Sequence, residues 1–212
     1  MLHQITRARR EHDFPARKLS RRALLSNMAL AAMAAICRPS YAQHGNLGLV
    51  SPPARLDDFW VIDQTAKRRR LNAVLLQGVT AVQTIYTGCS SVCPLQGALF
   101  SAVQEHLPKI RARYPVQLLS IGIDPLSDSP SALRDWLLRF DAGPAWNAAT
   151  PSLEDVDRMR IALSGSPLAL GNLAGHSTQI YCFDASAKLR WRSAELPRLE
   201  DVCDVLAALG RV

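Results

Sequence analysis

The stretch from Val79 to Pro94 constrains the fold of this 212-residue chain more than any other. Its first half, Val79–Tyr86, is rich in β-branched residues and predicts a buried strand. Cys89 and Cys93 follow, and Pro94 predicts the start of a helix because proline is favoured at the first helical position. We therefore expect Cys93 to cap the helix, and both thiols to lie near its positive end, where thiolate is favoured over thiol.

The remainder of the chain alternates between strand and helix patterns. Strands are predicted at 59–62, in a short segment from residue 70, and at 116–123, 145–149, 179–183 and 189–191, and helices at 94–107, 131–140, 152–163 and 199–209. This order favours an α/β sandwich in which helices flank a central mixed β-sheet. A cysteine-bearing turn directly after a core strand is typical of the thioredoxin-like form of that fold.

Residues 1–42 predict an export signal. Arg21-Arg22 precedes an apolar run that ends at Ile36, a pattern that indicates the twin-arginine route. The run is shorter than the roughly 20 apolar residues of a transmembrane helix. We therefore expect cleavage after Ala42, a periplasmic location, an N-terminal tail over 43–54 and one domain over 55–212. A retained N-terminal segment that anchors the chain in the membrane stays open as the alternative.

Charge is concentrated in the predicted signal. Residues 1–42 hold eight of the 25 Lys and Arg residues and two of the 18 Asp and Glu residues, leaving 17 basic and 16 acidic residues downstream. A nearly neutral domain does not support nucleic-acid binding. The remaining basic cluster, residues 67–70, predicts a solvated hairpin tip.

The four cysteines downstream of residue 42 allow more than one chemistry in an oxidising compartment. Cys89 and Cys93 are compatible with a metal site or a redox pair, whereas a structural disulfide that closes so few residues would stabilise the fold little. Cys182 and Cys203 are expected in the core, because free cysteine packs as a small hydrophobic residue. Whether these two form a disulfide is left open by the sequence.

Four segments resemble one known family. The segment 85–94 resembles the Cys-x-x-x-Cys-Pro signature of the Sco/SenC copper-delivery proteins, and 124–130 is similar to their Asp-Pro loop. Segment 143–146 is similar to their Gly-Pro-x-Trp segment, and 175–181 to their His-Ser-Thr strand. The match runs from about residue 55 to residue 209 and implies a thioredoxin-like fold.

The resemblance implies a copper site formed by Cys89, Cys93 and His176. Thiolate and imidazole are ligands that suit copper, so the residue types agree with that implication. Asp124 is expected either to orient His176 or to cap its own loop. One departure from the family pattern is Ser127, which stands where the family usually has an arginine, so any salt bridge made by that arginine is absent or replaced.

The implied function is that of an exported metallochaperone, rather than an enzyme, which assembles the copper centre of cytochrome c oxidase. Its implied partners are the copper-binding subunit of that oxidase and a periplasmic copper donor or thiol reductant. A thiol-disulfide oxidoreductase or redox sensor that uses Cys89 and Cys93 is the alternative. His176 separates the two functions, because disulfide exchange could proceed without an imidazole.

Overall fold

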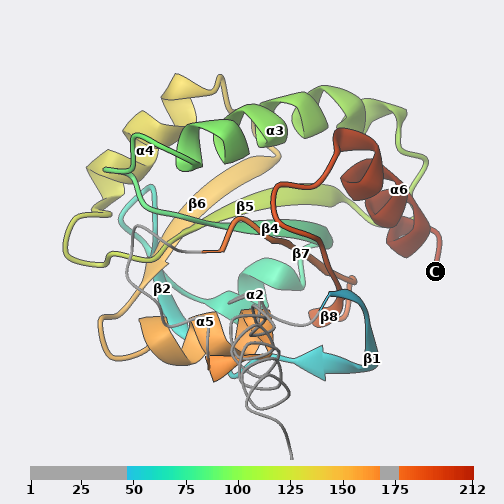
Figure 1. Ribbon diagram of the computed structural model, residues 1–212, viewed down its shortest axis with the longest axis horizontal. Helices are drawn as coiled ribbons and strands as arrows, with labels where there is room; N and C mark the ends of the chain where they lie inside the picture. Colours follow the sequence, from blue (N-terminus) through green and yellow to red (C-terminus); the bar gives the residue numbers. More distant parts are fainter. Residues whose placement is uncertain (1–46, 168–176) are drawn as a thin grey trace, which may run out of the picture. The chain divides into compact units, whose positions relative to one another are not determined.

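One mixed β-sheet runs through the part of the protein that the computed structural model describes, residues 47–167 and 177–212. Its strand order is β1-β8-β7-β4-β5-β6-β2-β3. Strands β4, β5 and β6 pair in parallel, and the other neighbours pair antiparallel (Figure 1). The strands are β1 (Gly48–Arg55), β2 (Trp60–Asp63), β3 (Arg68–Arg70), β4 (Val79–Ile85), β5 (Val116–Gly122), β6 (Trp146–Pro151), β7 (Ile180–Phe183) and β8 (Lys188–Arg192).

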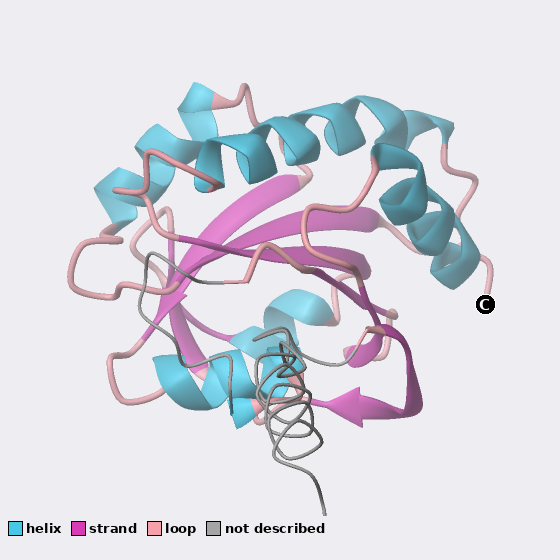
Figure 2. Ribbon diagram, in the orientation of Figure 1, coloured by secondary structure: helices cyan, strands magenta, loops and turns pink. Residues whose placement is uncertain are grey.

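Helices cover both faces of this sheet. Figures 1 and 2 show α3, α4 and α6 over one face and α2 and α5 over the other. The helices are α2 (Leu71–Leu75), α3 (Cys93–His106), α4 (Pro130–Arg139), α5 (Val156–Ser164) and α6 (Leu199–Gly210), and a 3₁₀ turn, η1 (Leu107–Lys109), follows α3. The α/β sandwich with a central mixed sheet, predicted from the sequence, is confirmed.

Strand β4 lies at the centre of the core, and all seven of its residues are buried. Its alternate side chains face opposite layers, because successive residues of a strand point to opposite faces. Ile85 packs in a cluster with Phe100 of α3, whereas Val82 packs in a second cluster with Leu75 of α2. Each such fully buried side chain stabilises the fold by about 1.5–3 kcal/mol.

The sheet begins earlier than the domain boundary expected at residue 55. Strand β1 falls within the segment assigned to a tail, and it pairs with β8, with Leu49 opposite Trp191. Pro52 and Pro53 interrupt the strand pattern in the sequence, and between Leu49 and Ala54 the register shifts. Prolines are tolerated here because β1 is an edge strand.

Two further expectations differ from the structure. The strand expected to start at residue 70 is β3, which instead spans Arg68–Arg70. It ends at Arg70 because helix α2 begins at Leu71. Helix α5 begins at Val156 rather than at the predicted residue 152, since residues 152–155 form a hydrogen-bonded turn in which Asp155 N–H donates to the Ser152 carbonyl at 3.1 Å.

Two cysteines lie away from the predicted site. Cys182 is buried in β7, and Cys203 on α6 packs against the same hydrophobic cluster; both are thiols. Over residues 47–167 and 177–212, no helix has the length and apolar character needed to cross a membrane. The expectations for the segment 1–42 lie outside the described residues.

Candidate functional site

The turn between β4 and α3 carries the two cysteines predicted to form the site. The N–H of Cys89 donates to the carbonyl of Tyr86 at 2.9 Å, which folds the chain back directly after the strand. Helix α3 begins at Cys93, one residue earlier than expected, and Val92 is its N-cap. Pro94 lies in the first turn, where its missing N–H costs no intrahelical hydrogen bond.

The two thiols differ in environment. Cys89 is partly exposed, and its Sγ lies 3.3 Å from Oγ of Ser91. Burial alone would raise the pKa of Cys89, but hydrogen bonds from the Ser91 hydroxyl, the N–H groups of Cys93 and Ser91, and the Cys93 thiol lower this pKa to about 6. Cys89 is therefore a thiolate at neutral pH, the form that attacks disulfides and binds soft metals.

Cys93 is completely buried beneath the start of α3. Burial raises the pKa of its thiol to about 12; the N–H of Tyr86, 3.4 Å from Sγ, opposes this shift, and the neighbouring Cys89 and Asp128 add to it. The pair is thus asymmetric at neutral pH, with one accessible thiolate and one buried thiol. Such an asymmetric pair is suited to binding a soft cation and also to disulfide exchange.

A buried carboxylate, Asp128, holds the cysteine turn against the neighbouring loop. Its Oδ1 accepts from the N–H and the hydroxyl of Thr87, at 2.8 and 2.7 Å, and its Oδ2 accepts from the N–H of Asp124 at 2.9 Å. Burial raises the pKa of Asp128, and these three donors oppose the shift. No basic side chain is among these partners, which agrees with Ser127 standing where an arginine was expected.

Gly122, the last residue of β5, makes room for this carboxylate. A Cβ atom at position 122 would lie 2.7 Å from both Cβ and Oδ2 of Asp128, closer than real Cβ contacts. The N–H of Ile123 then donates to the carbonyl of Ile85 at 2.9 Å, which keeps the ends of β4 and β5 together. The backbone at the end of β5 thereby positions the loop that supports the cysteines.

Asp124 closes its own loop through its backbone. Its carbonyl accepts from the N–H groups of Ser127 and Asp128 at 3.0 and 2.7 Å. The other role expected of Asp124, orienting His176, concerns a residue outside the described ranges. The residue that sequence reasoning missed is Asp128. The sequence shows Asp128 as the second acidic residue of segment 124–130. The pattern of residues along the chain does not reveal that its carboxylate reaches Thr87.

His176, the third predicted ligand, lies outside the described residues. The residue that follows it is well placed: the carbonyl of Ser177 accepts from the hydroxyl of Thr84 at 3.2 Å, near the end of β4. Glu195 accepts from the hydroxyl of Ser177 at 2.9 Å and from the N–H and hydroxyl of Thr178. Within the described ranges, no group of three or more His, Cys, Asp and Glu side chains is arranged to hold a metal ion.

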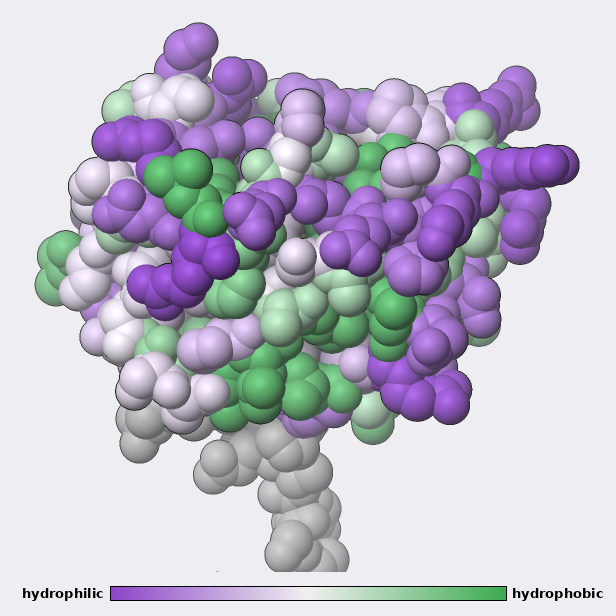
Figure 3. Space-filling model, turned by 90° about the horizontal axis from the view of Figure 1, so that it is seen from above, coloured by the Kyte–Doolittle hydropathy of each residue, from purple (hydrophilic) through white to green (hydrophobic). Residues whose placement is uncertain are grey.

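Apolar side chains are exposed in the elements that border the cysteines. Leu95, in the first turn of α3, is 54% exposed, and Leu126, in the loop closed by Asp128, is 79% exposed. Seen from the side of α3 and α4, the surface intersperses hydrophobic groups with hydrophilic ones (Figure 3). Exposed leucines beside a reactive pair of thiols are compatible with contact to another protein.

The sheet order and the cysteine turn together define a thioredoxin-like domain that carries an asymmetric pair of thiols. The family model described as SCO1/SenC matches residues 51–207, and the chain belongs to this family. A comparison with curated proteins finds no match.

Solved structures share the fold. A SCO1/SenC family lipoprotein from Bacillus anthracis is 24% identical, with a TM-score of 0.64, over 76% of this chain and 98% of that one. ScoI from Bradyrhizobium japonicum, solved with copper bound, is 21% identical, with a TM-score of 0.57, over 74% and 99%. Yeast Sco1, also solved with copper bound, is 18% identical, with a TM-score of 0.61, over 74% and 95%.

Proposed function

We propose that the protein is an exported copper metallochaperone that assembles the copper centre of cytochrome c oxidase, with Cys89, Cys93 and His176 as its copper ligands. The observation that carries the proposal is the asymmetric pair of thiols at the turn where the SCO1/SenC family has its cysteine signature. Two similar proteins were solved with copper bound, and another, BsSco, is described as a member of a family of cytochrome c oxidase assembly proteins.

The residues at this turn fit copper as a cargo. Thiolates select soft ions such as Cu(I), and Cys89 is already ionised at neutral pH. Cys93 must lose its proton on binding, and the positive ion offsets the cost of a buried thiolate. The carboxylate of Asp128 disfavours a bare Cys93 thiolate, whereas it attracts a positive ion that approaches the pair.

The third ligand we propose is His176, in the segment 175–181 that is similar to the family's His-Ser-Thr strand. Its described neighbour is Ser177, whose carbonyl accepts from the hydroxyl of Thr84 near the end of β4 at 3.2 Å. A site with three ligands leaves room for an acceptor to take the ion.

The acceptor we propose is the copper-binding subunit of cytochrome c oxidase, and a periplasmic copper donor or thiol reductant would act before it. Both must reach Cys89, which is the accessible thiol. Leu95 and Leu126 border that approach and are exposed, so they are the apolar contacts that such a partner could cover.

For location, we propose export by the twin-arginine route with cleavage after Ala42. An Arg21→Lys/Arg22→Lys variant should accumulate unprocessed in the cytoplasm. Normal processing of that variant would contradict this route, and a mature protein that keeps residues 1–42 would point instead to a membrane anchor.

Thiol-disulfide exchange is the second candidate function, because the same asymmetry suits it. An exposed thiolate with a pKa of about 6 can attack a disulfide, and a buried partner can then resolve the mixed disulfide. This chemistry requires both cysteines and does not require His176.

A complementation experiment separates the two functions. A strain that lacks the protein should lose cytochrome c oxidase activity when copper is scarce, and added copper should restore part of it by mass action. The His176→Ala variant should fail to complement if copper delivery is the function. Complementation by His176→Ala but not by Cys93→Ser would instead support thiol exchange. Normal oxidase activity in the deletion strain would reject a role in oxidase assembly, whether by copper delivery or by thiol exchange.

A further inference from the structure

A cavity of about 160 Å³ lies on the face of the sheet opposite Cys93. Its floor includes Leu119 and Ala149, which belong to the cluster beneath α2, whereas Cys93 packs in the cluster beneath α3. This space exceeds the roughly 30 Å³ that one liquid water occupies, and it falls below the roughly 300 Å³ of a drug-sized pocket. It suits a small polar ligand.

The wall of this cavity on the side of the β2–β3 hairpin is organised by a buried carboxylate. Oδ1 of Asp63 accepts from the N–H and hydroxyl of Thr65, at 2.8 and 2.6 Å, and from the N–H of Lys67 at 3.0 Å. Burial would raise the pKa of Asp63, but these donors and Arg69 lower it, so Asp63 is ionised. Its oxygens are occupied and its charge is paired.

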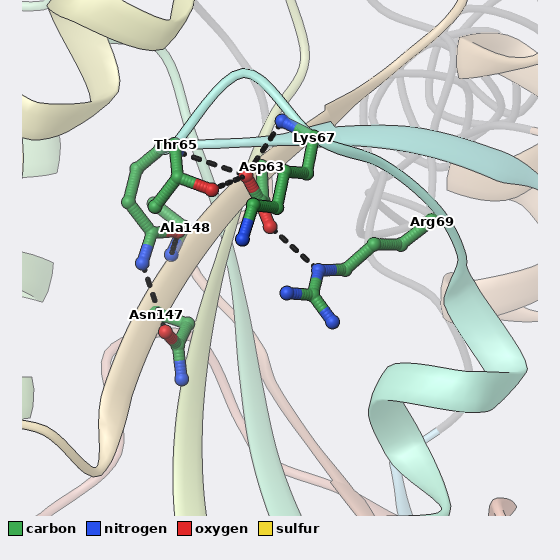
Figure 4. Close-up of polar contacts among 7 residues, drawn as sticks. Asp63, Thr65, Lys67, Arg69, Asn147 and Ala148 are labelled. Atoms are coloured by element: carbon green, nitrogen blue, oxygen red, sulfur yellow. Dashed lines mark hydrogen bonds and ion pairs between the residues drawn. The ribbon is translucent and has the colours of Figure 1, made fainter.

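Asp63 holds Arg69 by one nitrogen only. Nε of Arg69 donates to Oδ2 at 2.6 Å, and the two terminal nitrogens of the guanidinium point away from Asp63 (Figure 4). Within the described residues these terminal nitrogens have no hydrogen-bond acceptor, and the Arg69 side chain, which lines the cavity, is 43% exposed. A planar fork of N–H donors is thus fixed in direction and available.

Asn147, on strand β6, also lines the cavity and is held by a neighbouring side chain. The side-chain nitrogen of Gln64 donates to Oδ1 of Asn147 at 2.8 Å, and its oxygen accepts from the N–H of Ala148 at 3.1 Å. Gln64 therefore orients the amide of Asn147, which lines the cavity and whose nitrogen does not take part in this contact (Figure 4). Among the described residues that line the cavity, the side chains of Arg69, Gln77 and Asn147 carry N–H donors without an acceptor.

We propose that this cavity binds a short-chain carboxylate. The two terminal nitrogens of Arg69 match the two oxygens of a carboxylate, which is the bidentate geometry that a guanidinium favours. The amide nitrogen of Asn147 donates to the same head group. Val74, Leu119 and Ala149 then contact a short aliphatic tail. The site is separate from the cysteine pair and does not depend on copper.

Titration with sodium propionate, followed by backbone NMR, tests the proposal. Propionate should shift the amide signals of Thr65 and Ala148 saturably, whereas the neutral isostere propionamide should not. Arg69→Gln should weaken binding by about tenfold or more, because it removes both charge-assisted hydrogen bonds of the guanidinium. Val74→Phe, which fills the cavity and leaves Arg69 in place, should abolish binding even if Arg69→Gln perturbs the hairpin.

Arg68→Gln is the matched control. Arg68 lies on the same strand but stacks over the Trp60 ring, 4.2 Å from its centroid, and does not line the cavity. This variant should bind propionate within about twofold of the unmodified protein. Equal losses in Arg68→Gln and Arg69→Gln would show unspecific attraction to a basic hairpin and overturn the proposal. Amide shifts that do not saturate with propionate, or inorganic phosphate that binds as tightly as propionate, would also overturn the proposal.

Discussion

The carboxylate of Asp128 accepts two hydrogen bonds from Thr87, one from its backbone N–H at 2.8 Å and one from its hydroxyl at 2.7 Å. Thr87 lies two residues before Cys89, and Asp128 lies in the loop after β5. This pair therefore joins the cysteine turn to the neighbouring loop and limits how far the turn can move. The position of the thiols depends on a residue 35 positions after Cys93 in the chain.

Replacing Asp128 by alanine should destabilise the protein. The N–H groups of Thr87 and Asp124 would lose their acceptor, and each unsatisfied buried group costs about 1–3 kcal/mol. Urea unfolding should report the loss. Ser127→Ala is the control, because its exposed side chain should contribute no more than about 0.5 kcal/mol. Equal stability of the two variants would contradict the role assigned to Asp128.

Cys89 should react with iodoacetamide as an acidic thiol. Its alkylation rate should rise with pH, reach half its maximum near pH 6 and level off above neutrality, because the pKa of Cys89 is about 6. Ser91→Ala should shift this midpoint upward, since the hydroxyl that stabilises the thiolate is removed. A midpoint near pH 9 in the unmodified protein would contradict the asymmetry of the pair.

Copper binding should release protons in a pH-dependent number. At pH 8, Cys89 is a thiolate and Cys93 a thiol, so binding through both sulfurs should release about one proton, which comes from Cys93. The number should increase as the pH falls through 6, where Cys89 is protonated as well. Calorimetry in buffers of different ionisation enthalpy measures the number of protons released. Release of two protons at pH 8 would show that Cys89 is not ionised.

The sequence predicted the α/β sandwich well because the elements around the site carry strong local signals. Val79–Tyr86 is rich in β-branched residues, and Pro94 marks the start of α3 within one residue. Strand β1 escaped prediction because Pro52 and Pro53 disrupt its pattern, and only its pairing with β8 makes it a strand. Pairing between segments distant in the chain leaves little trace in local composition.

The two cysteines were predicted as a site, but their asymmetry was not. Spacing places both sulfurs near a helix end, which lowers both pKa values by the same argument. Burial of Cys93 reverses the effect for that residue, and burial is a property of the packed core. The role of Asp128 was also not predicted, since it depends on packing: its contact with Thr87 requires the space that Gly122 leaves.

Copper stoichiometry of the reduced protein tests the central claim most directly. The protein should bind one copper ion per chain, and the Cys89→Ser/Cys93→Ser and His176→Ala variants should each lose that ion or hold it far more weakly, because soft-ion affinity rests on these ligands. A Cys182→Ser variant, which removes a buried thiol of the core, should keep full stoichiometry. One copper ion per chain in the double cysteine variant would contradict the account.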